Sequence, residues 1–319
     1  MTHAPAVFSA GTVNADFSLR VDGRLERGAS LIATDLLCTS GGRAANVAVI
    51  ARRLGTPARL FGCVGADQLA EQALAGPRAA GVEIGAVRRV QAATGLVSIV
   101  VDADAAKTMV FAPGANDAFA EADVRRLVLD LHRAPAGSML VVDSEISPSA
   151  LALALQAARD DGRPTLLDPT RPEHVTDHVL AVSDHVTPNH DEAQRLTGVA
   201  VETAADALRA ARQLRERGAS HVHVRLPRGG CLTTWHDGEA LVLPPSDVHV
   251  VDTTGAGDAF AGTLASTLIS GCPLVEAVRR AVAAATCAVT RFGAQESYPD
   301  RRELEATTLT VRVEKAPVA

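Results

Sequence analysis

Lysine is nearly absent from this chain of 319 residues, which contains only Lys107 and Lys315. Neither follows a glycine in the Gly-Lys-Ser/Thr context of a Walker A loop, and no Val-Ala-Ile-Lys or His-Arg-Asp segment occurs. The sequence therefore excludes the P-loop and protein-kinase arrangements for handling phosphate. Any phosphate chemistry would depend on backbone amides, arginine and a metal ion.

Aromatic residues are scarce as well, at 3% of the chain, and the net charge is −6 with a pI of about 5.9. Stacking platforms for single-stranded nucleic acid need aromatic side chains, and binding to polyanions or anionic membranes needs excess positive charge. No apolar run reaches the roughly 18 residues of a transmembrane helix, and no signal peptide is recognisable at the N-terminus. We expect a cytoplasmic protein with a small-molecule partner.

Metal-ligand spacing is missing too. The five cysteines are scattered, odd in number and free of Cys-x-x-Cys spacing, which indicates reduced, mostly buried thiols. His221 and His223 share one face of a predicted strand, and a partly exposed strand explains this more simply than a zinc site. With 47% hydrophobic residues, the chain can bury a large core in one α/β domain or in two smaller ones.

The chain alternates between strand-like apolar runs and amphipathic helical segments, which predicts an α/β fold. Two regions instead predict short hairpins. Residues 19–37 break into brief apolar pieces at glycine turns, and 96–101 pair with 107–111. These hairpins are candidates for a lid.

The strongest functional signal is the segment Asp252-Thr-Thr-Gly-Ala-Gly-Asp258. Residues 248–251 are strand-like, whereas Phe260 and Leu264 begin a buried helical stripe. A glycine turn that opens a helix can approach an anion closely, and its N–H groups and the helix dipole attract negative charge. Asp258 could then accept a proton from an attacking hydroxyl group. The simpler alternative is an ordinary turn with Asp258 as a first-turn helix residue.

A second glycine pair opens a helix at Ser40-Gly-Gly-Arg-Ala-Ala-Asn46. Arg43 and Asn46 lie three residues apart, so they share one side of the first turn and could face a ligand; an ordinary loop and helix cap is the alternative. Nearer the N-terminus, Asn14 and Asp16 alternate at the end of a predicted strand and project from the same face. They could hydrogen-bond a polyol, and an Asx turn is the alternative.

Polar residues also follow later strands, at the edge where open α/β sheets bind ligands. Glu145 follows one strand and is a site candidate. Arg171 follows the next and could contact a phosphate or form a surface ion pair. Asn189 and Glu192 follow a third and could orient hydrated Mg²⁺, although a helix N-cap with its N3 glutamate has the same pattern.

Three of these motifs resemble those of the ribokinase-like (PfkB-type) carbohydrate kinases. Residues 252–258 resemble the C-terminal signature, 40–46 the N-terminal Gly-Gly signature, and 187–192 the Asn-x-x-Glu motif. The resemblance extends over about residues 7–305.

The resemblance implies a single ribokinase-like three-layer α/β/α kinase domain over residues 1–319, with a mostly parallel central sheet. A small β lid would be formed by about 12–40 and 95–112. The implied activity is ATP-dependent transfer of the γ-phosphate to a hydroxyl of a small sugar, with ribose or a similar furanose favoured. A homodimer through the lid is a further expectation.

The resemblance also implies roles for single residues. Asp258 would be the catalytic base, and the amides of Gly255, Ala256 and Gly257 would form an anion hole. The sugar would be held by Asn14, Asp16, Gly41, Gly42, Arg43, Asn46, Glu145 and Asp258. The nucleotide would be bound by Asn189, Arg225, Pro227, Gly230, Gly255 and Gly257. Mg²⁺ would be held through water by Glu192 and Asn189, and K⁺ by Asp252, Thr254, Gly293 and Ser297.

Two residues depart from the family pattern. Arg43 stands where ribokinases usually carry lysine, and this change bears on sugar preference. Pro227 stands where the nucleotide loop usually has glycine, which removes a backbone N–H and bears on the nucleotide contacts.

Two other functions remain open. A nucleoside kinase of the same fold would need apolar or aromatic residues in the lid, and residues 20–38 contain no aromatic. A non-catalytic sugar-binding regulatory protein would be expected to have lost Asp258 or the glycines before it, and both are intact.

We predict that Asp258→Asn abolishes turnover while largely preserving sugar and nucleotide binding, because the amide is nearly isosteric but cannot accept the hydroxyl proton. Loss of a general base typically costs about 10²–10⁴-fold in rate. Steady-state kinetics and calorimetric titration with sugar and nucleotide measure the two effects. A variant that kept the wild-type kcat would show that another group takes the proton.

Overall fold

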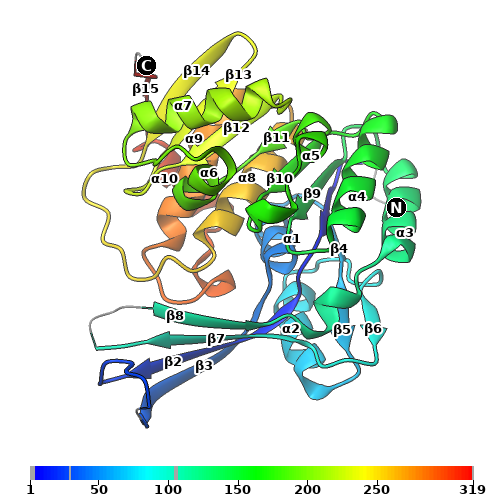
Figure 1. Cartoon of the computed structure of the whole chain (residues 1–319), viewed down its shortest axis with the longest axis vertical. Helices are drawn as coiled ribbons and strands as arrows, with labels where there is room; N and C mark the ends of the chain where they lie inside the picture. The colour runs from blue at the N-terminus through cyan, green and yellow to red at the C-terminus, as the bar shows by residue number, and fades with distance from the viewer. Residues whose placement is uncertain (1–3, 29, 104–106, 318–319) are drawn as a thin grey trace.

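The structure is a computed structural model that describes residues 4–28, 30–103 and 107–317. Figure 1 shows a large α/β body with a smaller sheet extending beneath it. Within the described residues, a nine-stranded sheet organises the body. Its strands, in sheet order, are β15 (Arg312–Lys315), β14 (Gly238–Leu243), β13 (Cys231–Trp235), β12 (His221–Arg225), β11 (His185–Val186), β10 (Thr165–Asp168), β9 (Met139–Asp143), β1 (Val7–Ala10) and β4 (Ala58–Phe61).

The strands from β4 to β12 run parallel, and the last three form an antiparallel edge. Parallel strands in a sheet of this kind are buried on both faces, so their sequences are continuous apolar runs, as in residues 139–142. Alternate residues enter opposite cores, so Val7 belongs to one hydrophobic cluster and Phe8 to the other. This pattern confirms the predicted α/β class with a mostly parallel central sheet.

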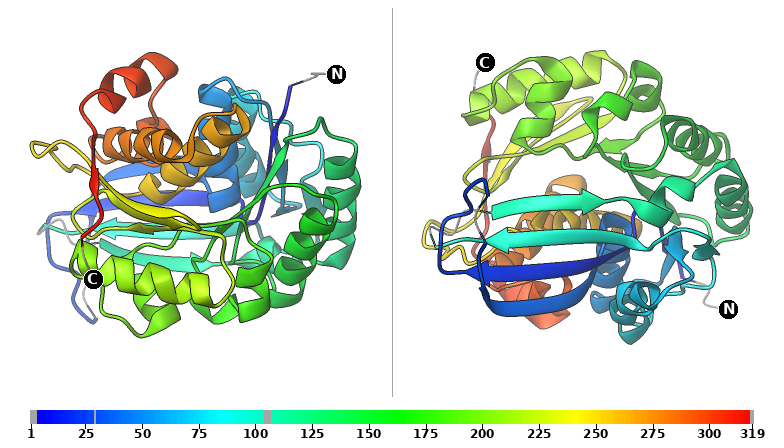
Figure 2. Two further views of the ribbon diagram at one scale, coloured as in Figure 1. Left: turned by 90° about the horizontal axis from the view of Figure 1, so that it is seen from above. Right: turned by 60° about the horizontal axis from the view of Figure 1, so that its bottom comes forward.

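Helices cover both faces of the sheet, as the left view of Figure 2 shows. The first core is covered by α1 (Arg43–Arg53), α2 (Gln68–Ala79), α8 (Ala256–Ile269), α9 (Leu274–Ala288) and α10 (Arg301–Thr308). The second core is covered by α3 (Glu121–His132), α4 (Pro148–Asp160), α5 (Asp177–Ala181), α6 (His190–Thr197) and α7 (Ala204–Glu216). None of the described helices combines the length and apolar character needed to cross a membrane.

Four further described strands form the smaller sheet, seen at the front of the right view of Figure 2. Their order is β3 (Ala33–Gly41), β2 (Asn14–Val21), β7 (Gly95–Val101) and β8 (Lys107–Ala112). The predicted pairing of 96–101 with 107–111 is confirmed by β7 and β8. The described residues of 19–37 belong to one long hairpin of β2 and β3 and do not form the small hairpins predicted there. Asn14 and Asp16 lie inside β2, so the Asx-turn alternative is wrong. That this sheet acts as a lid stays a prediction.

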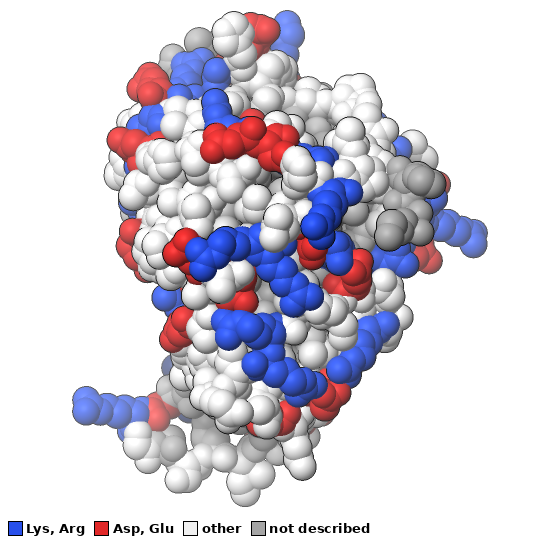
Figure 3. Space-filling model, turned by 90° about the vertical axis from the view of Figure 1, so that its right-hand side faces the viewer, with Lys and Arg blue, Asp and Glu red and all other residues white. Residues whose placement is uncertain are grey.

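The remaining elements are short connections. They are β5 (Cys63–Gly65), β6 (Arg88–Val90), and the 3-10 turns η1 (Gly114–Ala118), η2 (Pro172–His174) and η3 (Gln295–Ser297). On the face shown in Figure 3, basic and acidic side chains lie next to one another. Oppositely charged side chains also form ion pairs, such as that of Arg88 with Asp123, in which Nε lies 2.7 Å from Oδ1.

The strand predicted at residues 248–251 is absent from the structure, which has an irregular segment there. Val250 and Val251 are 56% and 48% exposed, so their β-branched side chains have no sheet surface to pack on. The N–H groups of Val251 and Asp252 instead donate to the carbonyl of Val289, just after α9, at 2.8 and 3.2 Å. The glycine turn before α8 is therefore held by a helix end and not by a strand.

The prediction of a partly exposed strand for the histidines of β12 is also wrong for His223, which is fully buried. Its Nε2 lies 3.1 Å from Nδ1 of His185, and its Nδ1 lies 2.8 Å from the Thr233 hydroxyl. Burial holds the pKa of His223 well below its ordinary value, so the ring is neutral. No cluster of three metal-ligating side chains suited to a metal ion occurs within the described ranges. All five cysteines lie in those ranges and are free, as predicted.

Close packing of α1 against α8 brings two of the predicted motifs together. A Cβ added at Gly262 would lie 2.3 Å from Ile50 Cγ2 and 2.9 Å from the carbonyl oxygen of Val47. Only glycine allows this approach, because no side chain separates the two helices there. The N-terminal turns of α1 and α8 consequently meet at the carboxyl ends of the central strands.

Candidate active site

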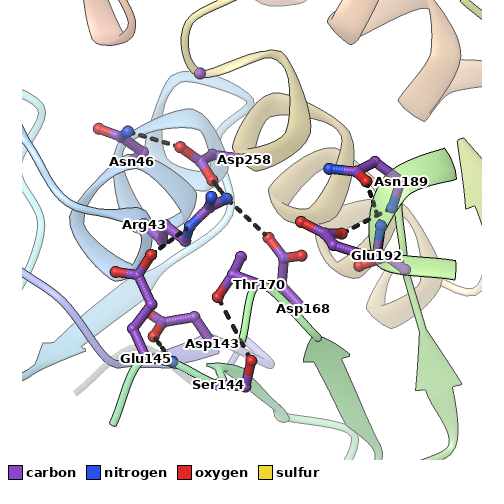
Figure 4. Close-up of polar contacts among 12 residues, drawn as sticks. Arg43, Asn46, Asp143, Ser144, Glu145, Asp168, Thr170, Asn189, Glu192 and Asp258 are labelled. Carbon is purple, nitrogen blue, oxygen red and sulfur yellow. Dashed lines mark hydrogen bonds and ion pairs between the residues drawn. The ribbon is translucent and has the colours of Figure 1, made fainter. Parts of the chain in front are cut away.

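The candidate site lies where parallel strands end and two glycine-led helices begin. Asp143 and Asp168 end β9 and β10, and Glu145, Thr170, Asn189 and Glu192 follow β9, β10 and β11. Figure 4 shows these residues around Arg43 and Asp258, with dashed lines from Arg43 to Glu145, Asp168 and Asp258. The sequence predicted a site at the carboxyl ends of the parallel strands, and the candidate residues lie there.

Asp258, the predicted base, lies in the first turn of α8 and is 5% exposed. Its Oδ2 accepts a hydrogen bond from Asn46 Nδ2 at 2.7 Å. Its Oδ1 lies 3.5 Å from Arg43 Nη1 and has no hydrogen-bond partner among the described residues. Burial raises the pKa of Asp258, although Arg43 and the Asn46 hydrogen bond oppose the shift. One carboxylate oxygen is thus oriented and the other is free to take a proton.

Arg43 contacts three carboxylates that come from three different elements. Its Nε lies 3.1 Å from Glu145 Oε1, and its Nη1 lies 3.5 Å from Asp258 Oδ1 and 3.6 Å from Asp168 Oδ2. Burial alone would lower the pKa of Arg43, but Asp168, Asp258 and Glu145 together raise it, so the side chain stays charged.

The backbone before Arg43 requires glycine. Gly42 has φ of 93°, and an added Cβ would lie 2.5 Å from the carbonyl oxygen of Thr12. The N–H of Arg43 donates to the Thr12 hydroxyl at 3.1 Å. This contact fixes the start of α1 against the loop that follows β1.

A pocket of about 260 Å³ opens beside Arg43. Its lining includes three predicted sugar-binding residues, Asn14, Arg43 and Glu145, together with Phe111, Asn116 and Arg171. The other predicted sugar-binding residues, Asp16, Gly41, Gly42, Asn46 and Asp258, are not part of this lining.

Asp16 nevertheless belongs to the same cluster of groups. Its Oδ2 would lie 2.0 Å from a Cβ placed on Gly41, so the glycine leaves room for the carboxylate. Burial, followed by the charge of Asp258, raises the pKa of Asp16 to about 7. Its Oδ1 has no hydrogen-bond partner within the described part of the chain. A buried acceptor without a partner is suited to a ligand hydroxyl.

Sequence reasoning missed Phe111, because it considered aromatic residues only in 20–38. In the smaller sheet Asp16 pairs with Val97, and Val97 pairs with Phe111, so all three face the same way. Phe111 therefore lines the pocket although it lies on β8. Arg171 lines this pocket too, and not the larger cleft described below.

Three residues that hold the candidates in place were also missed. Gln295 Nε2 donates to Asn46 Oδ1 at 2.9 Å, and Asn116 Nδ2 donates to Asn14 Oδ1 at 2.7 Å. The N–H of Glu145 donates to Asp143 Oδ1 at 3.0 Å. Asp143 and Glu145 are two residues apart, so this contact could have been predicted from the sequence. The partners in the other two pairs are far apart in the chain, so those contacts could not.

A larger cleft, of about 800 Å³, reaches the start of α8, where Ala256 and Gly257 line it. Its lining includes five predicted nucleotide-binding residues, Asn189, Arg225, Pro227, Gly230 and Gly257, but not Gly255. A Cβ on Gly257 would lie 2.0 Å from Arg225 Nη1. The guanidinium group therefore lies against the N-terminal turn of α8, where both charge and dipole attract an anion.

Pro227 fits the tight turn between β12 and β13. The N–H of Gly229 donates to the carbonyl of Leu226 at 3.1 Å, which makes Pro227 the second residue of a four-residue turn. Proline is favoured at that position because its fixed φ suits the turn. The departure from the family pattern is thus accommodated without strain in the loop.

The helix-cap alternative for Asn189 and Glu192 is present in the structure. Asn189 Oδ1 accepts from the N–H of Glu192 at 2.8 Å, and Glu192 Oε2 accepts from the N–H of Asn189 at 2.7 Å. The same Oε2 lies 3.2 Å from Arg225 Nη2. Burial raises the pKa of Glu192, with Arg225 acting in the opposite direction. The Mg²⁺ role stays a prediction.

The predicted cation residues tie two loops together. Asp252 Oδ1 accepts from the N–H of Thr254 at 2.9 Å, and Oδ2 accepts from the N–H of Gly293 at 3.0 Å. The Ser297 hydroxyl donates to the carbonyl of Ala294 at 2.7 Å. The two loops are adjacent beside the start of α8, and K⁺ binding there stays a prediction.

A family model described as pfkB family carbohydrate kinase matches residues 4–301. The chain belongs to this family. It is therefore an ATP-dependent phosphotransferase of the carbohydrate-kinase type, and kinases of the pfkB family use ATP and Mg²⁺.

Individual relatives agree with this assignment. The ribokinase of Haemophilus influenzae is 31% identical over 294 residues, which cover 92% of this chain and 95% of the relative. The deoxyribokinase of Salmonella typhi is 30% identical over 261 residues, covering 81% and 84%. The structure of Arabidopsis thaliana ribokinase complexed with ribose and ATP has a TM-score of 0.84 and 27% identity, covering 96% of this pfkB-family chain and 99% of the other. The ribokinase-like fold is confirmed.

We predict that Glu192→Gln raises the Mg²⁺ concentration needed for half-maximal rate and leaves the sugar KM nearly unchanged, because Mg²⁺ would lose a carboxylate that orients its water ligands. A Mg²⁺ titration of the rate, with a melting curve beside it, checks this. Asp300→Ala is the control, since Asp300 caps α10 away from the site through the N–H of Glu303 at 2.8 Å. If Glu192→Gln behaves like this control, with a lower melting temperature and an unchanged titration, the residue is only a cap.

Proposed function

We propose that the protein transfers the γ-phosphate of ATP to a hydroxyl group of a small sugar, with ribose or a similar furanose as substrate and Asp258 as base. The link of Asp258 to residues that line each of the two cavities carries this proposal. Its neighbour Gly257 lines the cleft of about 800 Å³, while its ion-pair partner Arg43 lines the pocket of about 260 Å³. A hydroxyl in the smaller pocket and a phosphate in the larger cleft would meet at this carboxylate.

The proton of the attacking hydroxyl would go to Asp258 Oδ1, the oxygen without a hydrogen-bond partner among the described residues. A buried carboxylate with a raised pKa is a better proton acceptor than an exposed one. The amides of Gly255, Ala256 and Gly257 open α8 and would stabilise the charge on the phosphate oxygens. MgATP, when bound, supplies the phosphoryl group and offsets part of its charge.

The smaller pocket suits a compact polyol. Its lining combines the amides of Asn14 and Asn116 with Arg43 and Glu145, which offer donors and acceptors to several hydroxyl groups. Relatives named as a ribokinase and a deoxyribokinase support a pentose, and the similar Arabidopsis structure contains ribose.

A nucleoside is the second candidate substrate, and one observation favours it. Phe111 is 52% exposed and lines the same pocket, where it could stack on a base. The pocket of about 260 Å³ is small for a sugar and a base together, so we favour the free sugar. A non-catalytic regulatory protein is disfavoured by the family assignment to carbohydrate kinases.

The metal sites belong to the same proposal. Glu192 and Asn189 offer oxygen atoms, which Mg²⁺ prefers, and would act through water because their side chains also cap α6. For K⁺ we propose the two loops that contain Asp252, Thr254, Gly293 and Ser297. Asp252 is 5% exposed and accepts from the N–H groups of Thr254 and Gly293, and a buried negative charge of this kind would attract a cation.

The test is ATP consumption measured against ribose, 2-deoxyribose, fructose and nucleosides, each with wild type and Asp16→Ala. We expect a furanose sugar to be the best substrate. An analogue that lacks the hydroxyl paired with Asp16 should lose roughly one to two orders of magnitude in kcat/KM, because a buried group left unpaired costs about 1–3 kcal/mol. Asp16→Ala should reduce that penalty, since the mutant has already lost the acceptor.

Two outcomes of this experiment count against the proposal. Preference for nucleosides over every free sugar would favour the second candidate. Equal deoxy penalties in wild type and Asp16→Ala would show that Asp16 does not touch the sugar, even if the sugar is phosphorylated.

We also propose a homodimer through the smaller sheet. Its face opposite Asp16 is apolar, and Leu36 and Val110 are 55% and 61% exposed on it. Leu36 pairs with Leu19, and Leu19 with Val100, so these apolar side chains form one row. A second copy of this face would cover the row. Light scattering should give the mass of two chains, and the mass of one chain at micromolar concentration would overturn this proposal.

A further inference from the structure

Asp168 lies at the end of β10 between two arginines that line different cavities. Its Oδ2 is 3.6 Å from Arg43 Nη1, which Figure 4 shows, and its Oδ1 is 3.4 Å from Arg225 Nη2. Arg43 lines the smaller pocket and Arg225 the larger cleft. Asp168 itself is 2% exposed and lines neither. Its ion-pair partners are these two arginines, so it can act on each cavity through the arginine that lines it.

Each arginine also has partners of its own. Arg43 contacts Glu145 and Asp258 on the side of the smaller pocket. Arg225 contacts Glu192 and lies against Gly257 on the side of the larger cleft. An unbroken series of alternating charges thus runs from Glu145 through Arg43, Asp168 and Arg225 to Glu192.

The two arginines compete for the one carboxylate of Asp168. Its separations from them, 3.4 and 3.6 Å, are long for charge-assisted hydrogen bonds, and Oδ2 has no hydrogen-bond partner among the described residues. Neither guanidinium is held in a close two-bond pair. In a buried site such charges influence one another strongly, so a stronger hold on one arginine weakens the hold on the other.

We propose that Asp168 is a positioning residue through which sugar binding strengthens nucleotide binding. The inference rests on the proposed function. Sugar hydroxyls that engage Glu145 and Asp258 would reduce the attraction of these carboxylates for Arg43. Arg43 would turn toward Asp168, Asp168 would release part of its hold on Arg225, and Arg225 would be free for phosphate oxygens at the start of α8.

The experiment is calorimetric titration of a non-hydrolysable ATP analogue with Mg²⁺, in the absence and presence of saturating ribose. In wild type we expect ribose to tighten analogue binding by at least about fivefold, and the analogue must tighten ribose binding by the same factor. In Asp168→Asn, which keeps the shape and removes the charge, the factor should fall toward one. A structural role alone would lower the melting temperature without changing this factor.

Asp123→Asn is the matched control, because Asp123 pairs with Arg88 at 2.7 Å away from both cavities. It should keep the wild-type factor. If Asp168→Asn does not fold, Arg225→Lys provides the second variant. It keeps the charge but lacks the planar fork, which places Nη2 beside Asp168 while Nη1 lies against Gly257 at the start of α8. Arg225→Lys should still bind the analogue and should lose the dependence on ribose.

The possible results separate the inference from the proposed function. If the wild type binds both ligands and either Asp168→Asn or Arg225→Lys keeps the full tightening of analogue binding by ribose, the inference is overturned and the proposed function is not. Wild type that binds both ligands independently does the same. Wild type that binds the analogue but neither ribose nor any other sugar overturns the proposed function and the inference together.

Discussion

Compensation of buried charge at the carboxyl ends of the central strands is the constraint on which the site depends. Asp168, Glu192 and Asp258 are 2%, 6% and 5% exposed, and their negative charges would repel one another and any phosphate. Arg43 and Arg225 lie between them, so each carboxylate has a positive neighbour within 3.6 Å. Removing one member would leave a buried charge without its partner, which is far more costly than losing a surface pair.

The same arrangement supplies positive charge to the site although lysine is nearly absent from the chain. The start of α8 offers amide N–H groups and the positive end of a helix dipole, and Arg225 lies against it at Gly257. Arg43 adds a second positive charge beside the smaller pocket. Both guanidinium groups contact carboxylates from other elements of the fold, which hold them near the carboxyl ends of the central strands.

The site also depends on two close approaches of the backbone. Gly262 lets α8 pack onto α1 near Val47, and Gly42 lets α1 start against Thr12. These contacts bring Asn46 to Asp258, residues that are 212 positions apart in the chain. The position of Asp258 beside Asn46 therefore depends on the meeting of the two glycine-led helices.

The sequence by itself determined those features that depend on residues close together in the chain. The apolar runs of the parallel strands, the capping pattern of Asn189 and Glu192, and the glycine turns before Arg43 and Asp258 were readable because each lies within a few residues. Tertiary structure decided the rest. Residues 248–251 have strand propensity but no sheet to join, and His223 is buried by neighbouring strands. Phe111 lines the smaller pocket because of the pairing of β8 with β7. Asp168 contacts two arginines that are 125 and 57 residues away in the sequence. Pairings of this kind are set by which strands lie next to one another, and no local pattern in the chain records them.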